Sequence, residues 1–400
     1  MHPPRADTVV VRYSGEIGVK SKAVQSRMEE VLRDNIGTML EERGFSDPVE
    51  SEHTRLYVRT APERIDEVTD VVTDAFGVVS ASPAVEVEPT MADICDALDQ
   101  TAFECYGSGT FAVRARRAGD ESAHPFSSTD IERRGGEAVW RAAEKRGVEP
   151  SVDLEDPDHT FHVECRPDRA FVFLRKEPGP GGLPLGTQEP VVALVSGGID
   201  SPVAAWLLMK RGCPVYPLYV DLGDYGGIDH RLRAEETVGR LARHVPGGFD
   251  LRVVPGGEGF DRIVGSTETC RMLVARRFML MIAERVADSL DAVGVVTGES
   301  VGQKSSQTSA SLGATSAAVD LPVHRPLLSM DKEEIIRRAR KIGTSEGANI
   351  DAGCNRLVPE TPATRPPLST VRDAEPDDIG QLARGAVDRV EVVSLPTVTE

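Results

Sequence analysis

The feature that most constrains this chain is an apolar run that ends in a short glycine-rich turn. Residues 191–195 read Val-Val-Ala-Leu-Val, and Ser196-Gly-Gly-Ile-Asp-Ser201 and Pro202 follow them. A continuous apolar run of this length is typical of a strand that is buried on both faces, as in a parallel sheet. Ser201 is a favourable N-cap and Pro202 a favourable first helical residue, so we expect a helix over residues 203–211.

A turn between a buried strand and a helix start has the properties of a phosphate site. Free backbone N–H groups and the positive end of the helix dipole attract anions there. Gly197 and Gly198 let the backbone approach such an anion closely. The turn is not the Walker pattern, because no G-K-[ST] is present. An isolated S-G-G also fits an ordinary tight turn, whereas the complete S-G-G-x-D-S pattern favours a nucleotide loop.

The rest of the chain predicts an α/β and α+β multidomain protein. Residues 1–83 have the β-α-β-α-β order of a ferredoxin-like domain, and residues 84–178 mix helices with alternating strands. The Gly/Pro-rich residues 179–189 are expected to form a linker. Residues 190–370 predict an α/β domain with a mostly parallel sheet, and residues 371–400 a polar, weakly patterned tail.

Composition limits the function classes and the location. The net charge of -18 argues against a simple polyanion binder. Of the 46 basic residues only 8 are Lys, so 38 are Arg, and this acidic, lysine-poor composition suits a protein kept in high salt. No apolar stretch is long enough to span a membrane, and the first residues do not resemble a signal peptide. We therefore expect a cytoplasmic protein from a halophilic source.

The six cysteines do not predict a metal site. No two have C-x-x-C spacing, so neither zinc nor an iron–sulfur cluster is indicated locally, and we expect no metal ligands among them. In a chain of this length without a signal peptide, a disulfide framework is not expected either. We expect most of them to be small buried side chains. The six are Cys95, Cys105, Cys165, Cys213, Cys270 and Cys354.

Several ordered motifs carry a family resemblance. The stretch Thr297-Gly-Glu-Ser-Val-Gly-Gln-Lys-Ser-Ser-Gln307 matches T-G-E-S-x-G-Q-x-x-S-Q, and the nucleotide turn is similar to the PP-loop of ATP pyrophosphatases. The matching stretches are residues 12–20, 110–119, 124–128, 181–187, 196–203, 297–307, 324–328, 331–335 and 354–366. Over residues 9–370 the chain resembles the ThiI-type tRNA 4-thiouridine synthases (tRNA sulfurtransferases). Together with the acidic composition, the resemblance implies a member of this family from a halophilic archaeon. The chain resembles the short form, since 400 residues leave no room for a rhodanese domain.

The resemblance implies a ferredoxin-like domain, a THUMP RNA-binding domain and a PP-loop domain that uses ATP and Mg²⁺. Asp200 would help to place the magnesium–pyrophosphate leaving group. Without the resemblance, Tyr219 and Val220 also fit a plain strand core, and Arg276 a solvated helix face. The ATP contacts that it implies are Leu194, Val195, Ser196, Gly197, Gly198, Ser201, Tyr219, Val220, Arg276, Gly298 and Gln307.

The THUMP resemblance implies tRNA as partner. Arginines can grip phosphates through two hydrogen bonds at once. Residues 337–341 form a second basic stretch in the PP-loop domain. The alternative for each patch is a solvated ion-pair face. The candidate RNA-binding residues are Arg114, Arg116, Arg117, Arg133 and Arg134.

The implied reaction has two steps. ATP adenylates O4 of a uridine, expected at position 8 of tRNA, and a sulfur nucleophile then displaces AMP. Cys354 lies in a polar loop and is the candidate catalytic thiol. Some archaeal relatives hold an iron–sulfur cluster with a C-x-x-C pair, but here the stretch reads Cys270-Arg-Met-Leu273. Sulfide, a persulfide carrier and a cluster all remain possible sulfur donors.

Three other functions remain open, together with the oligomeric state. The same enzyme class can deliver sulfur through a carrier protein to the thiazole of thiamine. A catalytically inactive RNA-binding protein and an amidating PP-loop synthetase are the further alternatives. The intact Ser196–Ser201 turn argues against the inactive protein, and the lack of a glutaminase domain argues against the synthetase. The resemblance also implies a possible homodimer.

Overall fold

The computed structural model describes residues 1–52, 54–119, 123–226, 228–304, 306–345 and 357–395. The chain divides into two compact units, Met1–Gly182 and Leu183–Glu400. The division falls inside the Gly/Pro-rich stretch in which the sequence predicts a linker. In the described part of the chain, no helix has both the length and the apolar character needed to cross a bilayer.

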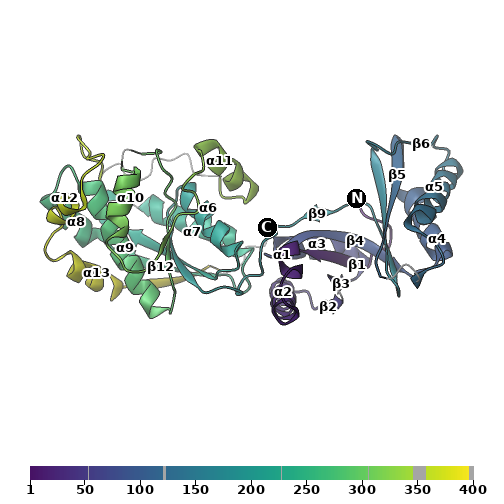
Figure 1. Cartoon of the computed structure of the whole chain (residues 1–400), viewed down its shortest axis with the longest axis horizontal. Helices are drawn as coiled ribbons and strands as arrows, with labels where there is room; N and C mark the ends of the chain where they lie inside the picture. The colour runs from purple at the N-terminus through teal and green to yellow at the C-terminus, as the bar shows by residue number, and fades with distance from the viewer. Residues whose placement is uncertain (53, 120–122, 227, 305, 346–356, 396–400) are drawn as a thin grey trace. The chain divides into compact units, whose positions relative to one another are not determined.

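The N-terminal unit is built on one sheet, with the strand order β2-β3-β1-β4-β8-β7-β5-β6 and β9 paired with β4 (Figure 1). Its described strands are β1 (Thr8–Tyr13), β2 (Val49–Glu52), β3 (Arg55–Arg59), β4 (Val78–Val87), β5 (Thr110–Arg117), β6 (Ser151–Val152), β7 (His159–Cys165), β8 (Ala170–Phe173) and β9 (Glu177–Pro178). Its described helices are α1 (Gly15–Gly18), α2 (Lys22–Glu42), the 3₁₀ turn η1 (Pro62–Arg64), α3 (Ile65–Asp74), α4 (Met91–Cys105) and α5 (Ser128–Lys145).

Strand β4 joins the half of this unit in which the sequence predicts a ferredoxin-like domain to the half in which it predicts a THUMP domain. It pairs with β1 along Val78–Ala84 and with β8 along Ala84–Val87, so it crosses the expected boundary between residues 83 and 84. Val9 and Val11 of β1 pack under α2 and α3, whereas Val10 packs with Tyr57 and Phe171 on the opposite face. Because both faces of β1 are covered, its apolar residues need not alternate. The domain boundaries themselves stay predictions.

The C-terminal unit has the mostly parallel sheet that the sequence predicts. The strand order is β14-β13-β10-β11-β12-β15, and in the described chain only β15 is antiparallel to its neighbour. Its described strands are β10 (Val191–Leu194), β11 (Val215–Asp221), β12 (Phe249–Pro255), β13 (Val295–Val296), β14 (Val323–His324) and β15 (Glu391–Leu395). Its described helices are α6 (Asp200–Met209), the 3₁₀ turn η3 (Gly223–Tyr225), α7 (Ile228–Ala242), α8 (Gly257–Ser266), α9 (Arg271–Ser289), α10 (Ser309–Ser316), α11 (Lys332–Lys341), α12 (Leu368–Asp373) and α13 (Ile379–Val387).

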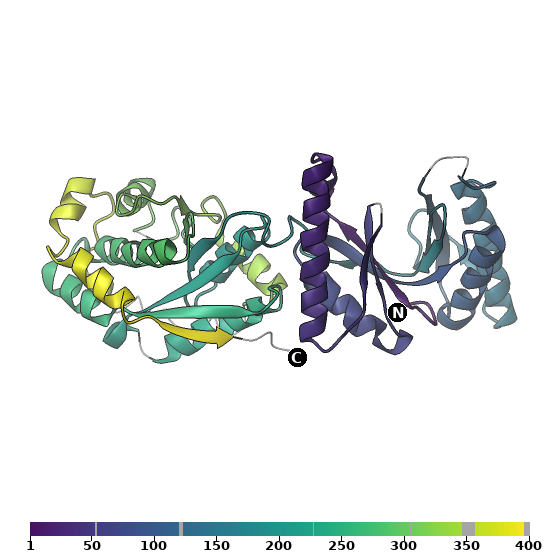
Figure 2. The same ribbon diagram turned by 90° about the horizontal axis from the view of Figure 1, so that it is seen from below.

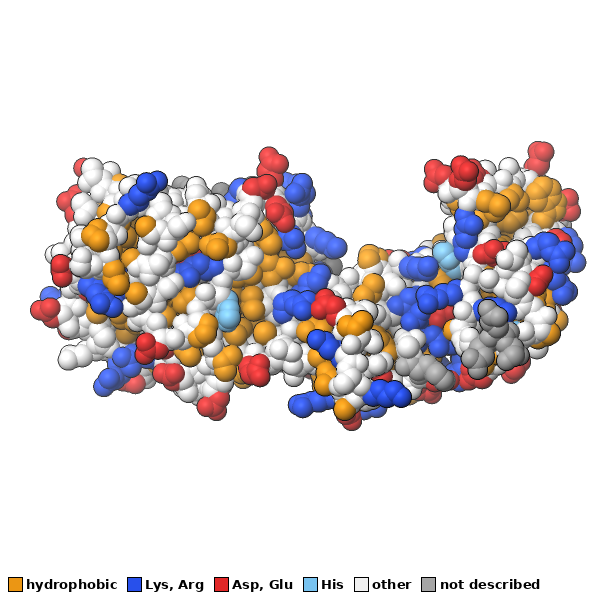
Figure 3. Space-filling view, in the orientation of Figure 1, with side chains coloured by type: hydrophobic (Ala, Val, Ile, Leu, Met, Phe, Trp, Pro, Cys, Tyr) orange, Lys and Arg blue, Asp and Glu red, His pale blue; other side chains and the backbone are white. Residues whose placement is uncertain are grey.

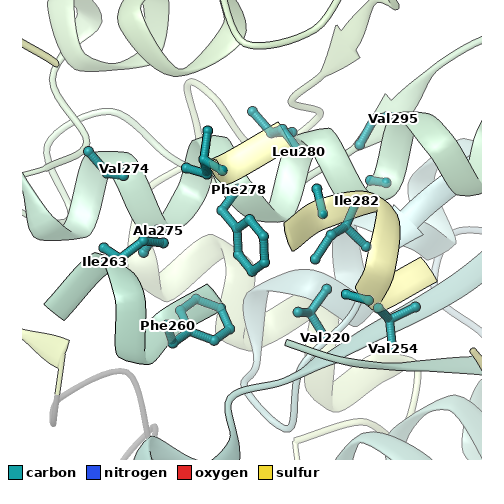
Figure 4. Packing of buried hydrophobic residues seen from close by; sticks show 14 of the residues in the cluster. Val220, Val254, Phe260, Ile263, Val274, Ala275, Phe278, Leu280, Ile282 and Val295 are labelled. Atoms are coloured by element: carbon teal, nitrogen blue, oxygen red, sulfur yellow. The ribbon is translucent and has the colours of Figure 1, made fainter. Parts of the chain in front are cut away.

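Helices cover both faces of this second sheet. Helices α6 and α7 pack on one face with α11 against α6, and α9 packs on the other face with α8, α10, α12 and α13 around it (Figures 1 and 2). Figure 4 shows the core under α9, where Phe278 meets Phe260 of α8 edge to face at 5.4 Å between ring centroids. This core fixes the carboxyl ends of β10 and β11, where an open α/β sheet binds its ligand.

The sequence predicts a polar, weakly patterned tail after residue 370, and this prediction is wrong for the residues that the structure describes. Helix α13 packs on α9 through Ile379, Ala383 and Ala386, which recur at helical spacing. Strand β15 then adds to the sheet beside β12. These residues therefore complete the C-terminal unit, because the edge of β12 and the face of α9 would otherwise be uncovered.

Candidate active site

Ser201 closes the glycine-rich turn between β10 and α6. Its Oγ accepts a hydrogen bond from the Ser196 N–H at 2.9 Å, and Ser196 Oγ accepts one from the Gly198 N–H at 3.3 Å. Helix α6 begins at Asp200, with Ile199 as N-cap and no side-chain cap. The predicted cap at Ser201 and helix start at residue 203 are therefore wrong, because the Ser201 hydroxyl binds the loop instead of the helix end.

Two glycines allow close approaches around the turn. A Cβ on Gly197 would lie 2.5 Å from Cβ of Arg233 on α7, and a Cβ on Gly298 would lie 2.7 Å from the backbone nitrogen of Ser201. No real Cβ tolerates such distances. Gly298 therefore lets the segment after β13 reach the start of α6, which brings two motifs that are far apart in the sequence to one place.

A cavity of about 280 Å³ opens beside the turn at the carboxyl ends of β10, β11 and β13. Every nucleotide-site residue predicted from the sequence, except Cys354, lines this single cavity. These lining residues are Leu194, Val195, Ser196, Gly197, Gly198, Asp200, Ser201, Tyr219, Val220, Arg276, Gly298 and Gln307. Cys354 lies outside the described residues. Segments more than a hundred residues apart thus converge on one pocket.

The carboxylate of Asp200 meets Lys332 at the mouth of the pocket. Lys332 Nζ lies 2.7 Å from Asp200 Oδ1, and 48% of the Lys332 side chain is exposed. An exposed ion pair of this kind contributes only about 0.2–1 kcal/mol. Both groups can therefore exchange partners at little cost when a charged ligand enters.

Glu299 holds Arg276 and Arg325 on the other side of the pocket. Its carboxylate lies 3.5 Å from Arg276 Nε and accepts a hydrogen bond from Arg325 Nε at 2.9 Å. Arg276 also donates to the backbone and side-chain oxygens of Ser306, each at 2.9 Å. Arg276 is therefore a fixed guanidinium at the pocket wall and not the solvated side chain that the alternative interpretation expected. The cluster has one more positive charge than negative.

The inner part of the pocket is apolar, and the side-chain amide oxygen of Gln307 lies in it without a hydrogen-bond donor from the described residues. Tyr219 and Val220, at the end of β11, are 4% and 6% exposed. Gln307 is 6% exposed, and its buried Oε1 has no hydrogen-bond donor within the described chain. Because a buried acceptor without a donor is costly, this oxygen is suited to a ligand donor. The other apolar lining residues are Leu222, Met272, Ala275, Met279, Leu280 and Leu357.

Several polar lining residues were missed by the sequence reasoning. Glu299 stands inside a quoted motif, so the motif could have indicated it. His230 and Arg233 come from α7, in a stretch without any motif, and Lys304 occupies a variable position of the T-G-E-S pattern. Arg233 is only 9% exposed, which is unusual for a guanidinium. Nothing in the sequence alone distinguishes Arg233 from the neighbouring surface arginines of that helix.

The five cysteines that the structure describes have no sign of a reactive thiol. The prediction that most of the cysteines are buried is met by Cys165 and Cys270 but not by Cys95, Cys105 and Cys213, which are partly exposed. Burial raises the pKa of Cys95, Cys105 and Cys213, and it raises the pKa of Cys165 to about 11. These four thiols therefore stay protonated and weakly nucleophilic near neutral pH. In the described ranges, no group of three or more His, Cys, Asp or Glu could hold a metal ion.

The predicted RNA-binding arginines do not form one patch. Arg114 and Arg116 of β5 alternate with Val113 and Ala115, which pack into the core formed by α4 and α5. Arg114 and Arg116 therefore lie on the sheet face opposite these helices. Arg133 and Arg134 are exposed on α5 itself, where Arg133 lies 3.7 Å from Asp130. Arg117 is half-buried at the end of β5 and has an interaction partner.

A larger basic surface surrounds Arg114 and Arg116, and we call it the cationic sheet face. Figure 3 shows Lys and Arg side chains gathered over the sheet of the N-terminal unit. The face consists of Arg12, Arg55, Arg114, Arg116, His162, Glu164 and Lys176. Buried Glu164 accepts hydrogen bonds from Arg12 at 3.3 Å and Arg55 at 3.1 Å. Burial alone would raise the pKa of Glu164, but Arg55 and Arg12 lower it.

Comparisons with known proteins agree with this architecture. The family models that match are "ThiI ferredoxin-like domain" over residues 8–82, "THUMP domain" over residues 87–175 and "Thiamine biosynthesis protein (ThiI)" over residues 186–378. The probable tRNA sulfurtransferase of Halobacterium salinarum is 55% identical over 96% of each chain. That of Methanosarcina acetivorans is 39% identical over 90% of this chain and 86% of the relative.

A solved structure is similar over the same range. The crystal structure of a 4-thiouridine synthetase–RNA complex with bound ATP has a TM-score of 0.81 and 29% identity, and covers 97% of this chain and 100% of its own. Fold and pocket together define a PP-loop protein with a ferredoxin-like half and a THUMP half. Within that class, the chain belongs to the ThiI family, the family of the probable tRNA sulfurtransferases.

Proposed function

We propose that this protein is an ATP-dependent tRNA sulfurtransferase that makes 4-thiouridine, with the uridine at position 8 as the expected target. The observation that carries the proposal is the convergence of the predicted nucleotide residues on one cavity beside the Ser196–Ser201 turn. The 4-thiouridine synthetase of similar structure binds RNA and ATP, which supports the same ligands here. The homodimer that the resemblance implies stays a prediction.

The first step forms an adenylate on RNA. O4 of the uridine attacks the α-phosphorus of ATP, and the bond to the pyrophosphate oxygen breaks. The N–H groups of the turn and the start of α6 would face the phosphates, where they stabilise the charge that develops on the leaving group. Lys332 and Arg233 supply positive charge beside the same turn. Tyr219 and Val220 would hold the adenine, and Gln307 Oε1 would accept a hydrogen bond from it.

The residues present fit a magnesium ion carried by the nucleotide. Magnesium in such sites takes one or two carboxylates together with phosphate oxygens and water, not a cage made only of protein. Asp200, which lines the cavity, supplies such a carboxylate once Lys332 moves to phosphate. The ion would neutralise charge on the pyrophosphate.

The second step replaces oxygen by sulfur. A sulfur nucleophile attacks C4, the C4–O4 bond breaks, and AMP leaves with that oxygen. With sulfide as donor, loss of the remaining S–H proton gives 4-thiouridine without any redox change. With a persulfide donor, the S–S bond must be cleaved by a second thiol, which becomes oxidised to a disulfide. We propose Cys354 for this sulfur-handling role, since the raised pKa values of Cys95, Cys105, Cys165 and Cys213 do not favour them.

The test is the product itself. The purified chain is incubated with unmodified tRNA, ATP, Mg²⁺ and sulfide, and tRNA nucleosides are measured by mass spectrometry. We expect 4-thiouridine and an equal amount of AMP from the wild type, no AMP from Asp200→Ala, and AMP without 4-thiouridine from Cys354→Ser under persulfide supply. tRNA binding by Asp200→Ala should stay near that of the wild type. A wild type that binds tRNA but releases no AMP would instead support the inactive RNA-binding protein.

A further inference from the structure

Helix α11 is strongly basic in an acidic chain. Its sequence, KEEIIRRARK, has a net charge of +3, whereas the whole chain has -18. Figure 3 shows Lys and Arg side chains at the position that α11 has in Figure 1. Positive charge is therefore concentrated locally in a chain that is acidic as a whole.

Three of the cations share one exposed face. Arg337, Arg340 and Lys341 are spaced i, i+3 and i+4, so they are neighbours on the helix surface. All three are exposed, and within the described chain none forms an ion pair or a side-chain hydrogen bond. Arg338 is not part of this group, because its guanidinium forms an ion pair with the carboxylate of Glu334, with 3.1 Å between nitrogen and oxygen. We call Arg337, Arg340 and Lys341 the α11 cationic face.

The helix is held firmly at both ends. Asp331 caps its start by accepting a hydrogen bond from the Glu334 N–H at 2.7 Å. Ile335 and Ala339 are fully buried beneath it. Beyond its end, the carbonyl of Gly343 accepts a hydrogen bond from Arg240 of α7 at 2.7 Å. The α11 cationic face is therefore presented by a rigid element, and its side chains need little ordering of the backbone to bind.

The start of α11 lies at the nucleotide pocket. Lys332 contacts Asp200 at 2.7 Å, and Ser300 Oγ donates to the carbonyl of Met330 at 2.9 Å. With a rise of 1.5 Å per residue, the α11 cationic face lies about 8–14 Å from Lys332 along the helix axis. That separation spans a few nucleotides of an RNA strand whose target base enters the pocket.

We infer that the α11 cationic face binds backbone phosphates of the RNA beside the target uridine. The inference rests on the proposed function and names the part of the C-terminal unit that contacts RNA. Three cations that have no ion-pair partner among the described residues, on a fixed helix, suit a polyanion, and arginine binds phosphate through two hydrogen bonds. The charges also stabilise the negative end of the α11 dipole, but that role needs no exposed arginine face as wide as this.

The test compares two variants of equal charge. R337A/R340A removes two arginines from the α11 cationic face. R372A/R384A removes two exposed arginines from α12 and α13, which have no ion pair with any described residue and lie at the opposite side of the unit (Figure 1). The full-length variants are compared for tRNA affinity over a range of KCl concentrations. We expect R337A/R340A to bind roughly tenfold more weakly and to lower the salt slope by about 1.4–1.8, and R372A/R384A to match the wild type.

The kinetics separate this inference from the proposed function. R337A/R340A should raise KM for tRNA while kcat for AMP release and the affinity for ATP stay unchanged. Wild-type affinity and salt slope in R337A/R340A would overturn the inference, even if the wild type makes 4-thiouridine. The inference would also be overturned if R337A/R340A bound tRNA as the wild type does but no longer received sulfur from a carrier protein. That result would indicate that the α11 cationic face binds an acidic protein partner. Failure of the wild type to release AMP would instead refute the proposed function.

Discussion

Arg233 reaches the nucleotide pocket from α7 with only 9% of its surface exposed. Its aliphatic stem fills the space that a side chain on Gly197 would need, so the turn and the arginine fit only together. A guanidinium buried beside a phosphate loop makes stronger hydrogen bonds to an anion than it would in water. We therefore assign Arg233 to the phosphates of the bound nucleotide, a role that no motif in the sequence indicated.

Arg233→Met tests this assignment because it keeps most of the stem and removes the charge. We expect kcat/KM for ATP in AMP release to fall about 10- to 100-fold, as loss of a charged hydrogen bond predicts. The thermal midpoint should change little, and the control Arg372→Met should behave as the wild type. Wild-type kinetics in Arg233→Met would show that Arg233 only supports the turn.

At the scale of elements, strands β1, β3, β5 and β7 carry most of the cationic sheet face, and Lys176 follows β8. His162 of β7 stacks on Phe173 of β8 with 5.0 Å between ring centroids, and Arg12 lies 4.8 Å from the same ring. Burial, followed by the charges of Lys176, Arg12 and Arg114, lowers the pKa of His162 from 6.5 to about 4. His162 is therefore neutral in the fold near neutral pH, where it adds no further charge to a crowded basic surface.

This lowered pKa predicts a pH dependence of stability. Between about pH 6.5 and about pH 4 the unfolded chain binds a proton at His162 that the folded chain does not. The contribution of His162 to stability is therefore complete above this window and is lost as the pH falls through it. The free energy of unfolding of His162→Gln should consequently fall less than that of the wild type over this window. Parallel pH profiles for the two proteins would contradict this prediction.

The sequence predicted some elements well because local signals were sufficient. The apolar strand before Ser196 has one reasonable interpretation, and β10 matches it. The start of α6 was misplaced because Ser201 hydrogen-bonds across the loop, which a capping rule cannot foresee. The last helix and strand were missed because β15 is stabilised by pairing with β12, a contact about 140 residues away.

The candidate site was predicted in the same uneven way. Residues inside motifs, such as Gly298 and Gln307, were found, and the structure brings them to one cavity. Arg233 and Lys332 were not predicted as site residues, since their importance arises from which neighbour they reach in space. The RNA candidates were taken from one predicted strand and one nearby predicted helix. In the structure, Arg114 lies on the sheet face opposite α5, the helix that carries Arg133.

At the scale of the whole molecule, each unit supplies a different part of the proposed reaction. The N-terminal unit carries the cationic sheet face, and the C-terminal unit carries the nucleotide pocket and the α11 cationic face. Basic surfaces in both units reconcile RNA binding with a net charge of -18, because charge is sorted locally and not averaged.

The central claim is that the Ser196–Ser201 turn holds ATP so that AMP is transferred to O4 of uridine. The most direct measurement uses tRNA labelled with oxygen-18 at O4 of the target uridine, together with ATP, Mg²⁺ and sulfide. We predict that the AMP released carries the label, because C4 loses its oxygen with the adenylate. Unlabelled AMP, formed while 4-thiouridine appears, would contradict it.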